Sequence, residues 1–504
     1  MVVQHNMQAA NANRMLNVTT SAQSKSTEKL SSGYRINRAA DDAAGLTISE
    51  KMRKQIRGLD QASTNAQDGV SSVQTAEGAL TEVHSMLQRM NELATQAANG
   101  TNSKDSDRQA IQDEIDQLTT EIDRVSETTK FNETYLLKGE AGTKTINMKA
   151  HDAGLKGTLT DNGDGTATFV MDTLNAGDKV SIGGKQYTIG GKAADVTAAF
   201  GANGLNIDTN HQDVSVNGTT YKWYADTVKT KDNKGISAGY YSQDPSTLAD
   251  QAAATATSVG GVATTSAATL AANAPHGSTI TVGSKSVTLM QDDGAKGGTA
   301  NDEIDDVDST VISKTKAYEL ASKELLAANQ IGDTKGNATV TKADGTTKLD
   351  ATNGDGTFKI KVGQAEVANS LSFSLHVGAD ADMTNKIQVN IDAMDSASLG
   401  IKGLNVKDAS GNAATYAVDA ISDAISKVSS QRSSLGAVQN RLEHTINNLD
   451  NVVENTTTAE SRIRDTDMAE EMVNYSKNNI LAQAGQSMLA QANQSNQGVL
   501  SLLQ

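Results

Sequence analysis

Residues 80–97 read LTEVHSMLQRMNELATQA and show a helical pattern. Its apolar residues recur at steps of three or four, at Leu80, Val83, Leu87, Met90, Leu93 and Ala97. This spacing places them on one face of an α-helix. Because residues 41–98 hold no proline and Asn99-Gly100 is a favourable C-terminal pair, we predict one long helix that ends near Asn99.

A second helix follows in the sequence. We expect it to begin at Ser106, with Gln109 as the partner in a capping box. Its apolar positions step by four, three, four and three, which forms a heptad seam. They are Ile111, Ile115, Leu118, Ile122 and Val125.

The C-terminal part of the chain returns to the helical pattern from about Ala417. The stripe comprises Val418, Ile421, Ile425, Val428, Leu435, Val438, Leu442, Ile446 and Leu449. We expect the polar run at residues 455–458 to interrupt the helix. A final helix then carries Leu481, Ala484, Met488, Ala492, Val499 and Leu502 on one side.

The middle of the chain has a different composition. Every arginine lies at or before Arg124 or at or after Arg432, whereas both prolines lie between them. Short alternating runs around a Gly-Gly, Gly-Ser or Asn-Gly turn predict β-hairpins at residues 180–189, 279–289 and 214–221. The segment Asn162-Gly163-Asp164-Gly165 recurs as Asn353-Gly354-Asp355-Gly356, and we interpret both as tight turns. We also expect a short helix near Lys316–Ala328. The predicted class is α+β, with helical bundles or coiled coils at both ends and a β-rich insertion between them.

Composition excludes several function classes. Asp plus Glu total 60 against 44 Lys plus Arg, giving a formal charge of -16, which argues against nucleic acid as a partner. The chain has no cysteine, so disulfides and thiolate chemistry are excluded. No apolar run approaches a membrane span, and Met1–Met7 does not have the composition of a secretory signal peptide, so we expect no membrane insertion, and any export from the cell would use another route.

No motif indicates an enzyme. The seven histidines are scattered, and none forms a metal-spaced pair. The sequence lacks a nucleophile elbow, a P-loop and a dinucleotide fingerprint. We therefore expect no catalytic, cofactor or metal site.

The two ends of the chain are the most informative feature. Residues 1–30 and 470–504 are rich in Ala, Gln, Asn and Ser, with thin apolar stripes and almost no rings. A helix with little apolar surface is marginal in water. We expect these ends to be loosely held in the free subunit and to fold against neighbouring copies.

Two distant blocks resemble one family in the same order, the bacterial flagellins. The N-terminal block holds Leu30-Ser31-Ser32-Gly33-Tyr34-Arg35-Ile36-Asn37, Asp41-Asp42-Ala43-Ala44-Gly45, Asn65-Ala66-Gln67-Asp68-Gly69 and Gln74-Thr75-Ala76-Glu77-Gly78-Ala79-Leu80. The C-terminal block holds Ser461-Arg462-Ile463, Asp467-Met468-Ala469, Gln483-Ala484-Gly485, Met488-Leu489-Ala490-Gln491-Ala492-Asn493 and Val499-Leu500-Ser501-Leu502-Leu503. The resemblance covers residues 1–140 and 415–504. The middle is similar only to the family's variable outer domains.

The resemblance implies a subunit that polymerises into the flagellar filament, an extracellular motility propeller. Residues 1–40 and 456–504 would then form the inner filament core, residues 41–140 and 404–455 a helical bundle, and residues 141–403 the variable β-rich outer part. The implied route is export of the unfolded chain through the flagellar type III apparatus. Implied partners are other copies, the export chaperone, and the filament cap and hook-junction proteins. We assign polymerisation contacts to Leu16, Leu30, Arg35, Ile36, Ile463, Leu481, Met488, Leu489, Val499, Leu500 and Leu503.

The family also implies a receptor site. The segment recognised by the vertebrate Toll-like flagellin receptor is similar to residues 87–93, Leu-Gln-Arg-Met-Asn-Glu-Leu. Candidate contacts are Leu87, Gln88, Arg89, Leu93 and Glu114. Asn91 departs from the arginine often found at its position. Leu93 also lies on the apolar stripe, so burial in the helical core explains it equally well, whereas Arg89 lies off the stripe.

Two other functions remain open from the sequence. A secreted adhesin could use the β-rich middle to bind mucus or a glycan. A hook-junction protein of the same helical superfamily is disfavoured by the Leu489–Asn493 pattern. Electron microscopy of the purified protein distinguishes a filament subunit from an adhesin, because an adhesin alone gives no filaments.

Overall fold

The computed structural model describes residues 6–99, 106–201, 204–256, 258–261, 264–275, 277–292, 302–342, 356–408 and 411–501. The chain forms two compact units. The first comprises residues 1–75, 372–390 and 433–504, and the second comprises residues 76–371 and 391–432. The helical ends and the β-rich middle confirm the predicted α+β class, whereas the expected domain boundaries stay predictions.

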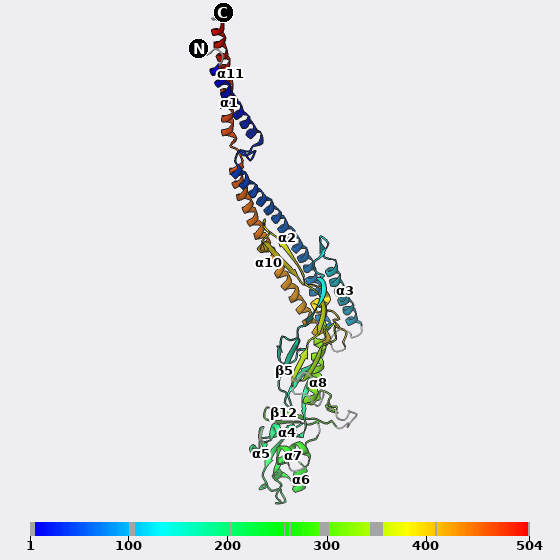
Figure 1. Ribbon diagram of the computed structural model, residues 1–504. Helices are drawn as coiled ribbons and strands as arrows, with labels where there is room; N and C mark the ends of the chain where they lie inside the picture. The colour runs from blue at the N-terminus through cyan, green and yellow to red at the C-terminus, as the bar shows by residue number, and fades with distance from the viewer. Residues whose placement is uncertain are drawn as a thin grey trace. The chain divides into compact units, whose positions relative to one another are not determined.

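Four helices supply the first unit. They are α1 (Met7–Ser32), the first part of α2 (Ala43–Ala98), the last part of α10 (Asn412–Arg464) and α11 (Met468–Ser501). α1 and α11 lie side by side, with the N-terminal end of α1 beside the C-terminal half of α11 (Figure 1). α2 begins where the Asp42 carboxylate accepts the Gly45 N–H at 2.8 Å, which satisfies a free donor of the first turn.

Within the first unit, α2 and α10 are joined by small and polar side chains. The Ser49 and Ser63 hydroxyls donate to the Glu460 and Asp450 carboxylates at 2.7 and 3.2 Å. Strands β17 (Leu371–His376) and β18 (Lys386–Ile391) form an antiparallel hairpin that packs on both helices. Gly69 admits this hairpin, because an added Cβ would lie 2.2 Å from Leu375 Cδ1.

A short crossing joins the segment after α1 to the segment after α10. Tyr34 and Asp465 form an antiparallel bridge, and the Arg35 N–H donates to the Arg464 carbonyl at 2.7 Å. The Arg464 guanidinium lies 4.6 Å from the centre of the Tyr34 ring, a cation–π contact. These contacts fix the chain where both helices end.

In the second unit, α2 buries the predicted stripe. Leu80, Val83, Leu87, Met90 and Ala97 are 0% exposed and Leu93 is 2% exposed. Helix α3 (Asp107–Thr128) follows as predicted, and its Ile111, Ile115 and Ile122 are buried. The predicted capping box is wrong: Ser106 adopts a helical backbone conformation and makes no capping hydrogen bond from its side chain.

Polar side chains of α3 hold the segment that leads into α10. Arg108 is 2% exposed, and its guanidinium donates to the Ala97 carbonyl at 3.1 Å and to the Asp408 carbonyl at 2.7 Å. The Gln112 amide donates to the Leu404 carbonyl at 2.9 Å and accepts the Val406 N–H at 2.7 Å. Buried carbonyls and amides of an irregular segment need such partners.

The polar run at residues 455–458 does not interrupt α10, so that prediction is wrong. The helix continues to Arg464. The Asn455 amide donates to the Asn451 carbonyl at 2.8 Å, so this polar side chain finds a partner within the helix instead of competing with it.

The β-rich middle belongs to the second unit. Within its described residues, one eight-stranded sheet has the order β10-β9-β8-β11-β12-β7-β13, with β6 paired to β7. The strands are β6 (Lys179–Ile182), β7 (Lys185–Gly191), β8 (Val214–Val216), β9 (Thr219–Tyr224), β10 (Gly239–Tyr241), β11 (Thr279–Val282), β12 (Lys285–Leu289) and β13 (Val311–Ile312). The pairs β6–β7, β8–β9 and β11–β12 are antiparallel hairpins, which confirms the three predicted ones.

A second sheet contains a repeated hairpin. Its order is β14-β15-β5-β4, with β4 (Gly157–Asp161), β5 (Thr166–Met171), β14 (Thr339–Lys342) and β15 (Thr357–Lys361). Gly165 and Gly356 directly precede β5 and β15 and have similar left-handed φ angles of 80° and 83°. The Val362 N–H donates to the Gly165 carbonyl and the Met171 N–H to the Gly356 carbonyl, so the two glycines occupy equivalent positions beside paired strands. Residues 353–355 lie outside the described part of the chain.

The remaining described elements complete the second unit. Strand β3 (Glu140–Asn147) pairs with β16 (Gln364–Asn369), and β1 (Lys130–Phe131) pairs with β2 (Thr134–Tyr135). The predicted helix near Lys316–Ala328 is α8 (Lys314–Asn329). Five shorter helices were not predicted: α4 (Ala193–Phe200), α5 (Ile207–Asn210), α6 (Gln251–Ala256), α7 (Ala267–Asn273) and α9 (Ser396–Leu399).

Candidate functional site

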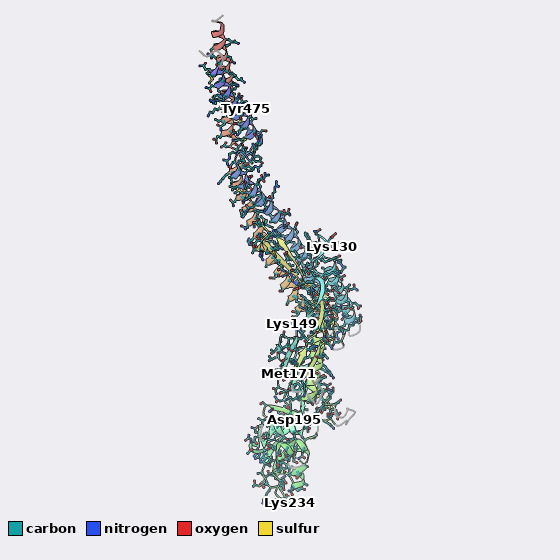
Figure 2. All side chains as sticks on the ribbon, in the orientation of Figure 1. Lys130, Lys149, Met171, Asp195, Lys234 and Tyr475 are labelled. Atoms are coloured by element: carbon teal, nitrogen blue, oxygen red, sulfur yellow. The ribbon has the colours of Figure 1, made fainter. Side chains whose placement is uncertain are left out.

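The α1–α11 pair differs from the rest of the fold in how little it buries. Ser26 is the buried side chain within the described part of α1, and the described side chains of α11 are all exposed or half-buried. The side chains along both helices project outward in Figure 2, where Tyr475 marks α11. A pair of helices with so thin an interface gains little free energy from packing.

Few polar contacts join the two helices among their described residues. The Asn6 amide donates to the Ala492 carbonyl at 3.1 Å, and Lys29 Nζ lies 3.8 Å from Glu471 Oε2. A Cβ added to Gly485 would lie 3.3 Å from Leu16 Cδ1, so this glycine lets the two helices approach closely. These contacts align the helices without covering their apolar side chains.

Many of the large apolar side chains instead point to solvent. Those on α1 are Met7 (72% exposed), Met15 (60%) and Val18 (60%). Those on α11 are Met468 (48%), Met472 (53%), Val473 (67%), Ile480 (66%), Leu481 (47%) and Met488 (64%). Soluble chains seldom leave so many large apolar side chains exposed on neighbouring turns.

On α11 these residues surround more than one face. Since each residue turns a helix by about 100°, Met472, Val473 and Leu481 lie at about 0°, 100° and 180° around the axis. The half-buried side that faces α1 holds Leu489. Exposed apolar side chains are stabilised when a partner covers them. α1 covers only one side of α11 and leaves these residues to solvent.

A shallow groove on α11 shows where another side chain can dock. Met472, Val473, Ile480 and Leu481 line it together with Ser476 and Lys477, around about 500 Å³. Its walls are largely apolar, so burying them removes hydrocarbon from water.

The predicted polymerisation residues differ in how exposed the structure leaves them. Leu481 and Met488 are exposed. Leu16, Leu30, Ile463 and Leu489 are half-buried, Ile36 is 2% exposed, and the exposed Arg35 donates to the Ile463 carbonyl at 2.6 Å. Val499 and Leu500 lie in α11, but their side chains are outside the described part of the structure, as is all of Leu503.

The sequence analysis missed several exposed apolar residues on the same helices. They are Met7, Met15, Val18, Met468, Met472, Val473 and Ile480. The prediction used a single apolar stripe on the last helix, so it did not include residues on the other sides of α11 or on α1. Counting apolar residues on every side of α11 would have found those on that helix.

The predicted receptor residues lie on α2 and α3 in the second unit. The Arg89 guanidinium donates to the Glu114 carboxylate at 2.9 Å and to the Glu92 carboxylate at 3.2 Å. These hydrogen bonds raise the pKa of Arg89. Arg89, Gln88 and Glu114 are exposed, whereas Leu87 and Leu93 are buried in the helical core. The exposed members therefore form a small charged and polar surface.

Neither a metal nor a membrane site is found in the described residues. Within them, no three His, Asp or Glu side chains are grouped so as to hold a metal ion. None of the helices examined in this part of the chain is both long and apolar enough to cross a bilayer.

Comparison with known proteins gives matches at both ends and along the whole chain. Residues 3–142 match the bacterial flagellin N-terminal helical region, and residues 418–503 match the bacterial flagellin C-terminal helical region. A flagellin of Clostridium tyrobutyricum is 38% identical over 99% of this chain and 100% of that protein. A flagellin of Bacillus subtilis is 34% identical over 100% of both chains, and a flagellin of Salmonella rubislaw is 35% identical over 97% of this chain and 96% of that protein. The chain therefore belongs to the bacterial flagellin family, the structural subunits of the flagellar filament.

Proposed function

We propose that this flagellin polymerises through the self-assembly surface, which we define as Met7, Met15 and Val18 on α1 with Met468, Met472, Val473, Ile480, Leu481 and Met488 on α11. The observation that carries the proposal is the exposure of these side chains on a helix pair that buries almost nothing itself. Neighbouring copies supply the missing apolar partners. A contact repeated by a rotation that does not close generates a helical filament.

Deletion tests the location of this surface. Removal of residues 1–30 or 470–504 should leave a soluble, folded subunit that cannot elongate seeds. A shortened subunit that elongates at the parent's rate would show that the surface lies elsewhere. Filament formation also decides between a filament subunit and an adhesin, because an adhesin without a filament role would leave seeds unextended.

We also propose export of the unfolded subunit through the flagellar type III apparatus. The absence of cysteine and the small amount of buried surface in α1 and α11 support this route, because neither disulfides nor strong packing at the ends oppose unfolding. The export chaperone would bind the C-terminal end and cover the exposed side chains of α11 before assembly. The cap and hook-junction proteins would bind subunits at the two ends of the filament.

Recognition by the vertebrate Toll-like flagellin receptor is a further part of the proposal. The exposed Arg89, Gln88 and Glu114 support it by residue type and position, and the buried Leu87 and Leu93 would hold the helix that presents them. A receptor carboxylate would have to replace Glu114 or Glu92 as the partner of Arg89.

A pull-down with the receptor ectodomain tests this contact. We expect Arg89→Ala to weaken binding, because the charged donor is lost. Arg124→Ala is the matched control, since Arg124 is an exposed α3 arginine whose ion pair with Glu121 is also three residues apart. Equal binding by Arg89→Ala and the parent would reject the contact.

A further inference from the structure

We propose that the self-assembly surface is also the main site of methionine oxidation, and that conversion of its thioethers to sulfoxides by a peroxide blocks polymerisation. This inference rests on the proposed function of that surface. It adds a chemical modification and its consequence.

The methionines fall into classes that differ in position. Met90, Met148, Met171, Met290 and Met394 are buried, and Met52 and Met86 on α2 are half-buried. The exposed methionines are Met7, Met15, Met383, Met468, Met472 and Met488. All of these except Met383 lie on α1 or α11, and Met1 lies outside the described residues. The accessible thioethers are therefore concentrated on the proposed interface.

The chain has no thiol that an oxidant could attack. It has no cysteine, so its sulfur is entirely thioether. One hydrogen peroxide molecule transfers an oxygen atom to the sulfur, which is oxidised by two electrons, while the peroxide O–O bond breaks and water leaves. The product is methionine sulfoxide, which reductases convert back to the thioether.

Oxidation changes what the surface can bury. A thioether is apolar and adapts to irregular contacts, whereas a sulfoxide carries a strong hydrogen-bond acceptor. Met472 shares its groove with Val473, Ile480 and Leu481, whose side chains offer a sulfoxide no donor; of the other lining residues, Ser476 and Lys477 carry donors, so a sulfoxide that faces the apolar side of the groove stays unpaired. Because an unpaired buried polar group is unfavourable, we expect one such sulfoxide to raise the critical concentration about tenfold.

The fold itself should survive this modification. The exposed methionines of α1 and α11 point away from the contacts that join the two helices, which involve Asn6, Leu16 and Lys29 on α1. The buried methionines are shielded in the second unit. A loss of assembly with an unchanged circular dichroism spectrum therefore separates surface chemistry from unfolding.

The test compares full-length monomer and filament treated with hydrogen peroxide, with peptide mass mapping of each methionine. In the monomer, Met7, Met15, Met472 and Met488 should oxidise before Met90 and Met171. In the filament they should be protected. Lack of protection in filaments would reject the proposed surface itself.

Seeded growth then tests the inference separately. Oxidised monomer should need at least about ten times the parent's concentration to elongate seeds, and methionine sulfoxide reductase should restore growth. A variant that combines Met7→Leu, Met15→Leu, Met468→Leu, Met472→Leu and Met488→Leu keeps the apolar surface, and it should elongate equally with or without peroxide. Equal growth by oxidised and untreated parent, with the methionines protected in filaments, would overturn the oxidation inference and leave the surface standing.

Discussion

Replacement of Ile480 and Leu481 by alanine should separate assembly from folding. Both side chains line the groove on α11 and are 66% and 47% exposed in the subunit. Alanine keeps the helix, since it has the highest helix propensity. Each replacement removes three carbons, and burial is worth about 0.8 kcal/mol per methylene. Scaling by the exposed fractions gives about 3 kcal/mol per subunit in the filament.

That free energy corresponds to an increase of about 100-fold in the critical concentration. The assay is growth from preformed seeds, measured by sedimentation and electron microscopy over a range of subunit concentrations. Circular dichroism of the variant should match the parent, because neither side chain is buried in the free subunit.

Val307→Ala is the matched control, because Val307 is 54% exposed but lies outside α1 and α11. It should change the critical concentration less than about twofold. The role of the α11 side chains in assembly is rejected if the double variant elongates seeds at the parent's critical concentration. It is also rejected if Val307→Ala raises the critical concentration as much as the double variant does, because the exposed apolar side chains of α11 would then not drive assembly.

Three further outcomes test the fold. Gly69→Val should lower the urea-unfolding free energy by about 2 kcal/mol, because its side chain would collide with Leu375, whereas Gly78→Ala, which meets nothing within 4 Å, should raise it by about 1 kcal/mol. Arg108→Ala should lower it by about 3 kcal/mol, measured the same way, because two buried carbonyls lose their donor. Burial raises the pKa of Asp333, but its backbone N–H partners outweigh burial and lower the pKa overall, so its stabilisation is present above about pH 4 and is lost as pH falls through the folded pKa. Asp333→Asn should therefore flatten the fall of the unfolding midpoint between about pH 5 and pH 3.

Local patterns in the sequence predicted much of the architecture. The stripe from Leu80 to Ala97 identified α2 because each of its members is buried on one face. The glycine turns at residues 183–184, 217–218 and 283–284 identified three hairpins, because only certain residues adopt left-handed backbone angles easily. Each of these signals depends only on residues close together in the chain, so the helix and the hairpins could be predicted from the sequence.

Features that depend on distant partners were beyond such patterns. Arg108 is buried because Asp408, far along the chain, supplies a carbonyl. The Asp123 carboxylate on α3 accepts the Ser396 N–H at 2.7 Å, and nothing near either residue indicates the other. α10 passes through a polar run because Asn455 bonds to its own helix. At the candidate site, sequence periodicity gave Leu481 and Met488 but not Ile480, whose exposure depends on which side of α11 faces α1.

The contrast between α2 and α11 explains how one chain can be both a stable subunit and a polymer. The two helices are long and carry many apolar residues, but Leu80 and Leu87 of α2 are fully buried, whereas Ile480 and Met488 of α11 are about two-thirds exposed. Folding free energy is thus concentrated in α2 and its partners, and the free energy of α11 is left for contacts with neighbours. If both helices were fully buried in the subunit, little apolar surface would remain to stabilise the filament. If both were exposed, too little would be buried to stabilise the folded subunit. A substitution in the α2 stripe should therefore lower stability and assembly together, whereas one at Ile480 or Met488 should lower assembly alone.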